Sequence, residues 1–177
     1  INAMKNKKAI MYKTGHSNLK TKLLENNFEL ASEVSGHMFF NDIYFGYDDA
    51  IYASFRVLRL INHMHKNNDS IDGFMNNLAT IYNTDELKIE VKEEYKFEIM
   101  HDIKNLLTQE AKNNNEITDI IDIDGVRINY KNGWALIRAS NTTPYLITRF
   151  ESTKQAQLQV YQDTISKAFN QALKKYI

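Results

Sequence analysis

Hydrophobic positions in the first half of the chain recur with both strand-like and helix-like spacing. The apolar run Lys8–Lys13, closed by a Thr-Gly pair, predicts a buried strand followed by a turn. Ser17 is suited to cap a helix that runs to about Asn26, and a second strand is expected over residues 28–34. The helix would bury one face, made by Leu19, Leu23 and Leu24.

A longer helix is expected after Gly46. Asp48 and Asp49 suit its start, because carboxylates there accept hydrogen bonds from free N–H groups and interact favourably with the helix dipole. The polar stretch 65–72 follows this helix, and one more short helical segment is expected to reach about Tyr82. The long helix has apolar side chains at the spacing of a core-facing surface, namely Ile51, Phe55, Leu58 and Ile61.

A different pattern begins near Asn83. Leu87–Lys92 alternates as a half-exposed strand does, and Phe97–Ala111 repeats at helical spacing. Further strands, two of them joined by a Lys-Asn-Gly hairpin turn, and a C-terminal helix are expected at Asp119–Tyr130, Trp134–Arg138, Tyr145–Phe150 and Thr153–Tyr176. This order predicts an α/β piece over residues 4–82, followed by an α+β domain over residues 83–177 with an antiparallel sheet and helices on one face.

The composition is that of an ordinary globular protein. Apolar residues make up 43% of the 177 positions, which is enough for a core in one domain or in two small ones. The 22 basic and 22 acidic side chains balance, so no overall charge attracts the chain to nucleic acid or to an anionic membrane. The lack of cysteine excludes disulfides and fits a cytoplasmic location, and no apolar run is long enough to span a bilayer. Residues 1–3, before Met4, are typical of an expression tag and not of a signal peptide.

A polar loop before the last expected strand has the composition of an anion site. It reads Arg-Ala-Ser-Asn-Thr-Thr-Pro over residues 138–144 and contains the single proline of the chain. The Arg138 guanidinium can hold a phosphate with two donors, and the hydroxyls of Ser140, Thr142 and Thr143 can add further hydrogen bonds. The alternative interpretation of the same composition is an ordinary polar turn.

Two polar clusters in the first half follow expected strands, where α/β layers usually hold their ligands. The first surrounds His16, and the second is Ser32–His37. In the second cluster Glu33 and Ser35 are two positions apart, so in an extended segment both side chains point the same way and suit vicinal hydroxyls of a sugar. His37 can act as an acid or base near neutral pH, or as a hydrogen-bond donor. A purely structural role for each histidine is the alternative.

Metal binding is not indicated by the remaining acidic residues and histidines. Asp122 and Asp124 stand in a segment that alternates like a strand entering a turn, and two carboxylates are too few for a hard cation. His63 and His65 are expected to be solvated at a helix end, and His101 is in an amphipathic helix without a partner ligand. A zinc site is therefore not expected.

Together these motifs resemble the C-terminal part of the α-D-phosphohexomutases. The resemblance extends over nearly all of the chain from about Lys8, and the most similar group is bacterial phosphomannomutase/phosphoglucomutase. The loop at residues 138–144 fits this group better than the phosphoglucosamine mutases, in which the loop more often reads Arg-Pro-Ser-Gly-Thr-Glu-Pro. The motifs that carry the resemblance are Lys13-Thr-Gly-His-Ser17, Ser32-Glu-Val-Ser-Gly-His37, Phe39-Phe-Asn-Asp-Ile-Tyr-Phe-Gly-Tyr-Asp-Asp49, Asp124-Gly-Val-Arg-Ile128 and the loop itself.

The resemblance implies an enzyme of four domains in which a phosphoserine exchanges phosphoryl groups with a hexose phosphate through a bisphosphorylated sugar. The substrates would be 1- and 6-phosphates of mannose or glucose. This chain would hold part of domain 3 and a domain 4 similar to the TATA-box-binding protein. By the same resemblance the sugar would be bound by Glu33, Ser35, His16 and His37, and the phosphate by Arg138, Ser140, Asn141 and Thr142.

The sequence also departs from the pattern of the family. The sugar loop usually begins with Gly-Glu, whereas Ser32 precedes Glu33 here. The phosphoserine motif Thr-Ala-Ser-His-Asn-Pro and the metal loop Asp-Gly-Asp-Gly-Asp-Arg, which belong to the first two domains, do not occur in these residues. We therefore expect no metal in this chain, Mg²⁺ in domain 2 of the parent enzyme, and no turnover by this chain alone.

Two other functions agree with parts of the pattern. A non-catalytic interaction or assembly module derived from the same fold would also lack the catalytic motifs. Nucleic-acid binding, which only the sheet-and-helix form of the second half suggests, is disfavoured by the zero net charge and the lack of a basic stripe. The chain is expected to begin inside domain 3, so apolar surface near Ala9–Tyr12 would be open to self-association.

Overall fold

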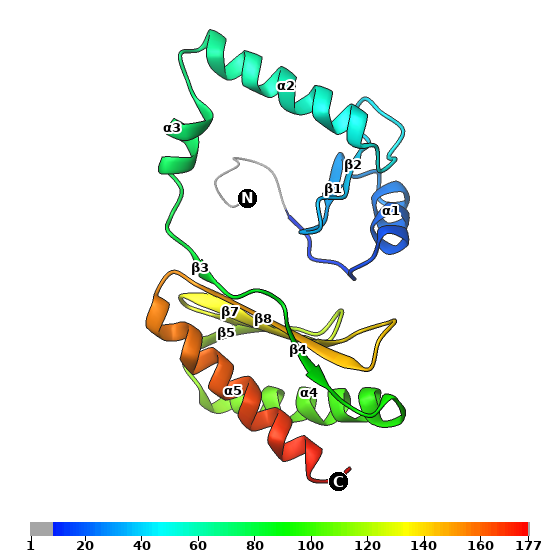
Figure 1. Ribbon diagram of the computed structural model, residues 1–177, viewed down its shortest axis with the longest axis vertical. Helices are drawn as coiled ribbons and strands as arrows, with labels where there is room; N and C mark the ends of the chain where they lie inside the picture. Colours follow the sequence, from blue (N-terminus) through cyan, green and yellow to red (C-terminus); the bar gives the residue numbers. More distant parts are fainter. Residues whose placement is uncertain (1–8, 177) are drawn as a thin grey trace. The chain divides into compact units, whose positions relative to one another are not determined.

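The computed structural model of the protein describes residues 9–176 and divides the chain into two compact units, Ile1–Leu78 and Ala79–Ile177. The first unit contains three helices and a small hairpin, and the second is an antiparallel sheet covered by two helices (Figure 1). The expected tag at residues 1–3 and the first residue of the expected opening strand lie outside the described residues.

A helix and a β-hairpin form the core of the first unit. α1 (His16–Glu25) packs against β1 (Leu30–Ser32), which pairs in antiparallel register with β2 (Met38–Phe40). This arrangement buries Leu23 of α1 and Phe39 of β2, which are 1% and 0% exposed. The buried contacts fix the hairpin against the start of the helix, where the first predicted site cluster lies.

α2 (Ala50–Lys66) and the short α3 (Ile71–Asn76) complete the first unit. Asp49 is the N-cap of α2, and its carboxylate accepts a hydrogen bond from the Tyr52 N–H at 2.9 Å. The expected core face of this helix is exposed instead, because within the described part of the first unit the hairpin strand β2 contacts α2 only near its start, where the Phe40 ring meets the Tyr52 ring. The exposed fraction of Ile51, for example, is 74%.

The structure corrects three expectations for the first half. Residues 9–13 form no strand, because no strand in the described part of the chain lies beside them to supply backbone hydrogen bonds. The first helix begins at His16 with Gly15 as its N-cap, and not after a Ser17 cap. The second expected strand is shorter, since only Leu30–Ser32 pairs with a neighbour.

Six antiparallel strands form the sheet of the second unit. β8 pairs with β7 on one side and with both β3 and β4 on the other, and β6 and β5 continue the sheet beyond β7. The strands in chain order are β3 (Tyr82–Asn83), β4 (Leu87–Glu90), β5 (Ile117–Ile121), β6 (Val126–Tyr130), β7 (Gly133–Ala139) and β8 (Tyr145–Ser152).

Both helices of the second unit lie on the same face of this sheet (Figure 1). They are α4 (Lys96–Asn113), which follows the short 3-10 turn Glu93–Tyr95, and α5 (Gln155–Leu173). The layer between helices and sheet is the main core of the chain, and full burial of each large apolar side chain there contributes roughly 1.5–3 kcal/mol. Its most buried members include Ile99, Ile103, Ile128, Ile137 and Tyr161. The predicted antiparallel sheet with helices on one face is confirmed.

Element boundaries in the second half differ from the prediction in three places. The segment 119–130 contains two strands, because a turn at residues 122–125 separates β5 from β6, with Gly125 in the left-handed region at φ 76°. Tyr82 is not the end of a helix and pairs with β8 in the sheet. The C-terminal helix ends at Leu173.

Candidate functional site

The tip of the β1–β2 hairpin carries most of the first cluster of predicted site residues. The Glu33 N–H donates to the His37 carbonyl and the Gly36 N–H donates to the Glu33 carbonyl, both at 3.0 Å, so residues 33–37 form a tight turn. Gly36 has φ 95°, a conformation that other residues adopt only with strain. Ser35 therefore lies exposed in a turn, and not in the extended segment that its spacing from Glu33 predicted.

The Glu33 carboxylate is fixed to the start of α1. Its Oε1 accepts a hydrogen bond from the Gly15 N–H at 2.8 Å, which holds the neighbouring His16 beside the hairpin. Oε2 of Glu33 forms no hydrogen bond within residues 9–176, so one carboxylate oxygen can still accept a hydrogen bond. Ser32 precedes it as an ordinary strand residue without a positive φ, so the backbone does not require a glycine there.

Asp48 contacts both histidines of the cluster. Its Oδ2 lies 2.5 Å from His37 Nδ1 and 3.8 Å from His16 Nε2. Its Oδ1 accepts a hydrogen bond from the Met38 N–H at 3.3 Å. The two imidazole rings lie 5.9 Å apart in an edge-to-face arrangement, and both side chains are about half exposed. Because Nδ1 of His37 donates to Asp48, Nε2 is left to face a ligand.

Neighbouring contacts hold Asp48 in this position. Its backbone forms an isolated bridge with Phe39 of the hairpin. The adjacent Asp49 caps α2 and accepts a hydrogen bond from the Tyr44 hydroxyl at 2.6 Å. The Tyr44 ring stacks on the Tyr52 ring, with 3.8 Å between the ring centroids. The sequence pattern places both aspartates at the helix start, but the cap uses one of them. A helix cap needs only one acidic residue, so the second of two adjacent aspartates is the signal that could have identified Asp48 as a residue of this cluster.

The histidines change the electrostatics of Asp48. The hydrogen bond with His37 lowers the pKa of Asp48 below its usual value of 3.8, and the nearby ring of His16 acts in the same direction. Asp48 is therefore a carboxylate throughout the pH range in which histidines ordinarily titrate. It can orient His37 whether or not that ring is protonated.

The second group of predicted site residues lies in the loop between β7 and β8. The Ser140 N–H donates to the Tyr145 carbonyl at 2.9 Å and closes the loop. The Ser140 hydroxyl oxygen accepts hydrogen bonds from the Thr142 and Thr143 N–H groups at 3.3 and 3.2 Å. It also lies 2.7 Å from the Thr143 hydroxyl. Ser140 is only 6% exposed, so it holds the loop together from within.

Three donor groups of this loop form no hydrogen bond or ion pair within the described part of the chain. They are the Arg138 guanidinium, the Asn141 side-chain amide and the Thr142 hydroxyl. Arg138 is half-buried near the end of β7, on the helix-free face of the sheet, since the alternate residues Ile137 and Ala139 are buried in the core. A cationic fork, an amide and a hydroxyl so close in the chain are a suitable set for a phosphate group.

Gly125 supports Arg138 through a close backbone approach. A Cβ atom on Gly125 would lie 2.3 Å from the Ile137 carbonyl oxygen and 2.6 Å from the Arg138 Cα, which is closer than atoms can pack. The glycine of the Asp-Gly-Val-Arg-Ile segment is therefore required where β7 passes the turn before β6. The sequence alone marked this segment as a motif without showing that it touches the loop.

The residues interpreted as structural have protein partners or lie at the surface. Asp122 forms an ion pair with Lys104 at 2.6 Å, and His63 Nε2 lies 3.0 Å from the Asn67 amide nitrogen. His65 and His101 are exposed. Over residues 9–176 no group of three histidine or acidic side chains is arranged to hold a metal ion. None of the helices in this range has the length and apolar character needed to cross a membrane.

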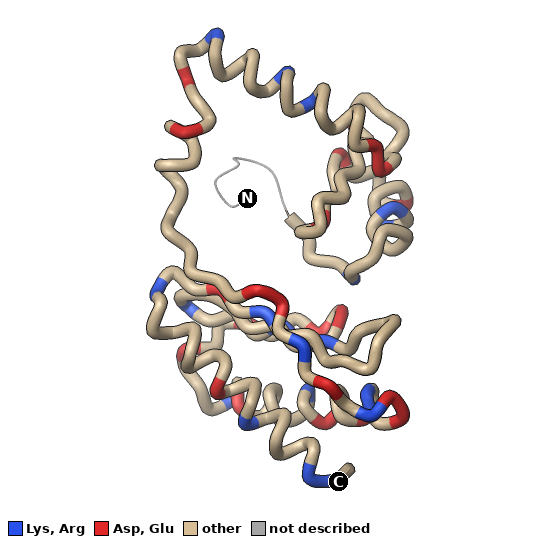
Figure 2. Tube along the Cα trace, viewed as in Figure 1, with Lys and Arg blue, Asp and Glu red and all other residues tan. Residues whose placement is uncertain are grey.

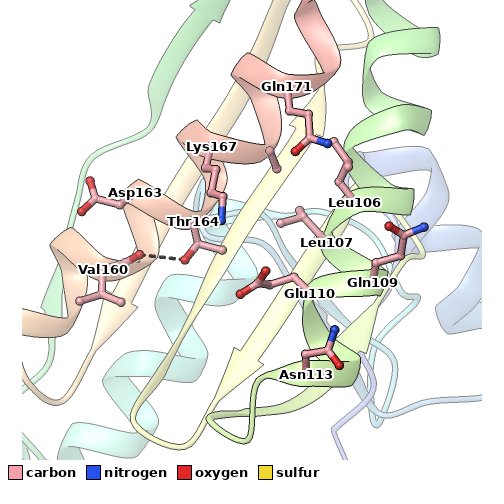
Figure 3. Close-up of a pocket in the computed structure, with 11 residues that line it drawn as sticks. Leu106, Leu107, Gln109, Glu110, Asn113, Val160, Asp163, Thr164, Lys167 and Gln171 are labelled. Carbon is pink, nitrogen blue, oxygen red and sulfur yellow. Dashed lines mark hydrogen bonds between the residues drawn. The ribbon is translucent and has the colours of Figure 1, made fainter.

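A hollow of about 440 Å³ lies elsewhere in the second unit, between α4 and α5 (Figure 3). Leu106 and Leu107 line it from α4, and Thr164 and Lys167 line it from α5. The Thr164 hydroxyl is already used, because it donates to the Val160 carbonyl of its own helix at 3.0 Å. No predicted site residue lines this hollow, so it extends neither cluster.

Two sequence models of one family match the chain. The alpha/beta/alpha domain III of phosphoglucomutase/phosphomannomutase matches residues 1–81, and the C-terminal domain of phosphoglucomutase/phosphomannomutase matches residues 86–168. The chain therefore belongs to the phosphoglucomutase/phosphomannomutase family. The resemblance to the phosphohexomutases that the motifs indicated is confirmed.

Individual relatives agree with this assignment. Proteins named phosphomannomutase/phosphoglucomutase from Pseudomonas putida and Pseudomonas syringae pv. tomato are 38% and 39% identical to the chain, over 88% and 94% of its length. A structure of a phosphoglucomutase/phosphomannomutase family protein from Burkholderia thailandensis has a TM-score of 0.77 at 32% identity and covers 92% of this chain. The matches cover 32% or 33% of these three proteins, so the chain spans about a third of their length.

Proposed function

We propose that this chain supplies the sugar-binding and phosphate-binding parts of a phosphohexomutase that interconverts the 1- and 6-phosphates of mannose or glucose. The observation that carries the proposal is the set of donors at residues 138–142 that form no hydrogen bond or ion pair within residues 9–176, in a chain that matches domain III and the C-terminal domain of the family. The relatives are named phosphomannomutase/phosphoglucomutase, which supports a hexose phosphate as the ligand class.

Arg138 is proposed to hold the phosphate that is not being transferred. Its planar fork offers two parallel donors to phosphate oxygens, and Asn141 and Thr142 add neutral donors beside it. Ser140 contributes by keeping the loop closed. Such a clamp recognises the phosphate and not the carbon that carries it, which is what an exchange of the two reacting ends requires.

The sugar is proposed to bind at the hairpin of the first unit. Oε2 of Glu33 can accept a hydrogen bond from a sugar hydroxyl, and the exposed Ser35 can donate or accept one. His16 and His37 add ring nitrogens to the same cluster. His37 is the candidate acid or base, because Asp48 binds its Nδ1 and leaves its Nε2 open.

The transfer step itself is assigned to other parts of the parent enzyme. The sequence contains neither the phosphoserine motif nor the acidic metal loop. We therefore propose that Mg²⁺ binds in another domain and that this chain alone does not turn over substrate. A cytoplasmic location and a fold of the TATA-box-binding-protein type for the second unit belong to the same proposal; the sheet with helices on one face supports the latter.

A titration of the isotope-labelled chain with glucose 1-phosphate, followed by NMR, tests the phosphate assignment. We expect the amide signals of Asn141 and Thr142 to shift. Arg138→Ala should weaken binding about tenfold or more, because a charge-assisted hydrogen bond contributes ~1.5–3 kcal/mol. Arg59→Ala is the matched control, since Arg59 is an exposed residue of α2 with no ion pair in the described chain. Unchanged binding by Arg138→Ala would contradict the clamp.

Inorganic phosphate distinguishes the phosphate assignment from the sugar assignment. It should shift the NMR signals of the loop at residues 138–144 and leave those of residues 33–37 unchanged, whereas glucose 1-phosphate should shift the signals of both segments. Glu33→Gln should weaken binding of the sugar phosphate and not of inorganic phosphate. Hairpin signals that ignore glucose 1-phosphate would show that the sugar assignment is wrong. In a coupled assay the chain alone should form no glucose 6-phosphate.

A non-catalytic assembly role is the second candidate, and the exposed apolar side chains of α2 favour it. It predicts that the chain associates through this helix and binds neither phosphate nor sugar phosphate. The titrations above therefore distinguish the two functions directly.

A further inference from the structure

Lys96 is a buried cation directly beneath the loop at residues 138–144. It is the first residue of α4, and its side chain is 1% exposed. Its Nζ donates to the Glu93 carboxylate oxygens at 2.7 and 2.9 Å and to the Thr143 carbonyl at 3.0 Å. These three contacts use all three donors of the ammonium group.

The first residue of α4 and the segment before this helix hold the loop at two successive carbonyl groups. Lys96 binds the carbonyl of Thr143, and the Val91 N–H donates to the carbonyl of Pro144 at 3.0 Å. Both carbonyls are therefore bound by residues at or just before the start of α4. Asn141 and Thr142, which carry two of the unpartnered donors, remain exposed on the outside of the loop.

The two partners of this ion pair differ strongly in exposure. The Glu93 side chain is 63% exposed, whereas that of Lys96 is 1% exposed. Water screens an exposed carboxylate more effectively than a buried ammonium group, so the pair leaves a positive potential inside the protein. A neutral donor could hold the Thr143 carbonyl without the cost of burying a charge. The charge itself is therefore the feature that needs an explanation.

We infer that Lys96 is a positioning residue of the phosphate site, which fixes the loop and adds positive potential beneath a bound phosphate without touching it. The inference rests on the proposed function, because the anion is the phosphate assigned to Arg138. The ligand chemistry is a dianionic phosphate group, and inorganic phosphate is a sufficient probe.

The test compares variants that change the charge of each partner in the full chain. Lys96→Met keeps the length of the side chain and removes the charge, and it should weaken phosphate binding about fivefold or more. Glu93→Gln keeps a hydrogen-bond acceptor for Lys96 and removes the counter-charge, so it should tighten binding about twofold to fivefold. Lys131→Met is the control, because the Lys131–Glu116 pair, at 2.9 Å, lies at the opposite end of β7. It should change binding less than about 1.5-fold.

The two variants should change phosphate affinity in opposite directions, and this distinguishes an electrostatic role of Lys96 from a purely structural one. If Lys96 only braces the loop, Glu93→Gln weakens binding or leaves it unchanged, and either result overturns the inference. Glu93→Gln keeps one acceptor oxygen for the buried Lys96, so this variant decides the question even if Lys96→Met does not fold. Arg138→Ala is measured in parallel. Loss of binding by Arg138→Ala without tightening by Glu93→Gln refutes only the role of Lys96, whereas unchanged binding by Arg138→Ala refutes the proposed function itself.

Discussion

Asp48 Oδ2 lies 2.5 Å from Nδ1 of His37, so a carboxylate from the segment before α2 orients the ring of the candidate acid or base. The contact defines a tautomer as well as an orientation. A neutral His37 that donates from Nδ1 has a lone pair on Nε2, and this is the nitrogen that remains open to a ligand.

Replacing Asp48 with Asn should reverse this tautomer. The Asn amide can donate a hydrogen bond to Nδ1, which favours the form of His37 that carries its proton on Nε2. We expect the ring nitrogen chemical shifts of His37 to change accordingly and glucose 1-phosphate to bind more weakly. The loop at residues 138–144 should still bind inorganic phosphate as in the wild type. Ring shifts that are identical in Asp48→Asn would show that Asp48 does not set the tautomer.

The first unit should lose stability below about pH 4. Three aspartates of this unit have a pKa below the usual value of 3.8 because each accepts a side-chain hydrogen bond. Arg56 donates to Asp42, His37 to Asp48 and Tyr44 to Asp49. A carboxylate with a lowered folded-state pKa stabilises the fold above its unfolded-state pKa, and this contribution is lost as the pH falls through the lower folded-state value. Urea unfolding of the first unit, followed by its NMR signals between about pH 2 and pH 6, should show this loss.

Arg56→Met provides the control for this pH dependence. Arg56 is the largest cause of the lowered pKa of Asp42, with an ion pair at 2.8 Å. Its removal should make the unfolding midpoint less sensitive to acid while lowering it at neutral pH. If the unfolding midpoint of Arg56→Met changes with pH as steeply as that of the wild type, the ion pair of Asp42 makes no contribution to stability.

Gly125→Ala should damage both the fold of the second unit and its loop at residues 138–144. The added Cβ would clash with the backbone at Ile137 and Arg138, and φ at this position is 76°. We expect a loss of at least about 2–4 kcal/mol in the free energy of unfolding, together with weaker phosphate binding. Gly36→Ala is the comparison, because it also has a positive φ but nothing within 4 Å of its Cβ. It should cost about 1–2 kcal/mol and leave phosphate binding unchanged. Equal losses in the two variants would contradict the close contact with Arg138.

The sequence predicts local structure best where the partners of a segment lie nearby in the chain. Apolar spacing and turn residues predict the hairpin of β6 and β7 and the helices α4 and α5. The helices pack on the sheet, and the apolar side chains of both are buried between them. The expected strand at Lys8–Lys13 fails for the opposite reason. Its apolar run has the pattern of a buried strand, but residues 9–13, the part that the structure describes, have no neighbouring strand within residues 9–176.

The candidate site shows the same difference between contacts that are local in the sequence and contacts that join distant residues. The motifs located the hairpin and the loop, because their polar residues are adjacent in the sequence. The contacts that support them join distant positions: Lys96 meets Thr143, and Gly125 meets Arg138. No periodicity or spacing encodes such pairs, because they arise only when the sheet and its helices assemble.

The exposed face of α2 leads to a prediction of self-association. Ile51, Phe55 and Leu58 are 74%, 65% and 59% exposed and recur at helical spacing. Figure 2 shows that charged residues occupy few positions of this helix. Contact of this apolar face with water is unfavourable, and a second copy of the chain can cover it with the same face.

Light scattering should therefore show dimers or larger species at high concentration. The triple variant with serine at Ile51, Phe55 and Leu58 should reduce association at least tenfold. Val160→Ser, which changes an apolar side chain of α5 that is 52% exposed, should leave association unchanged. A wild-type chain that remains monomeric at high concentration would show that this face needs no partner, and association that persists in the triple variant would direct attention to the exposed Ile10 and Met11 instead.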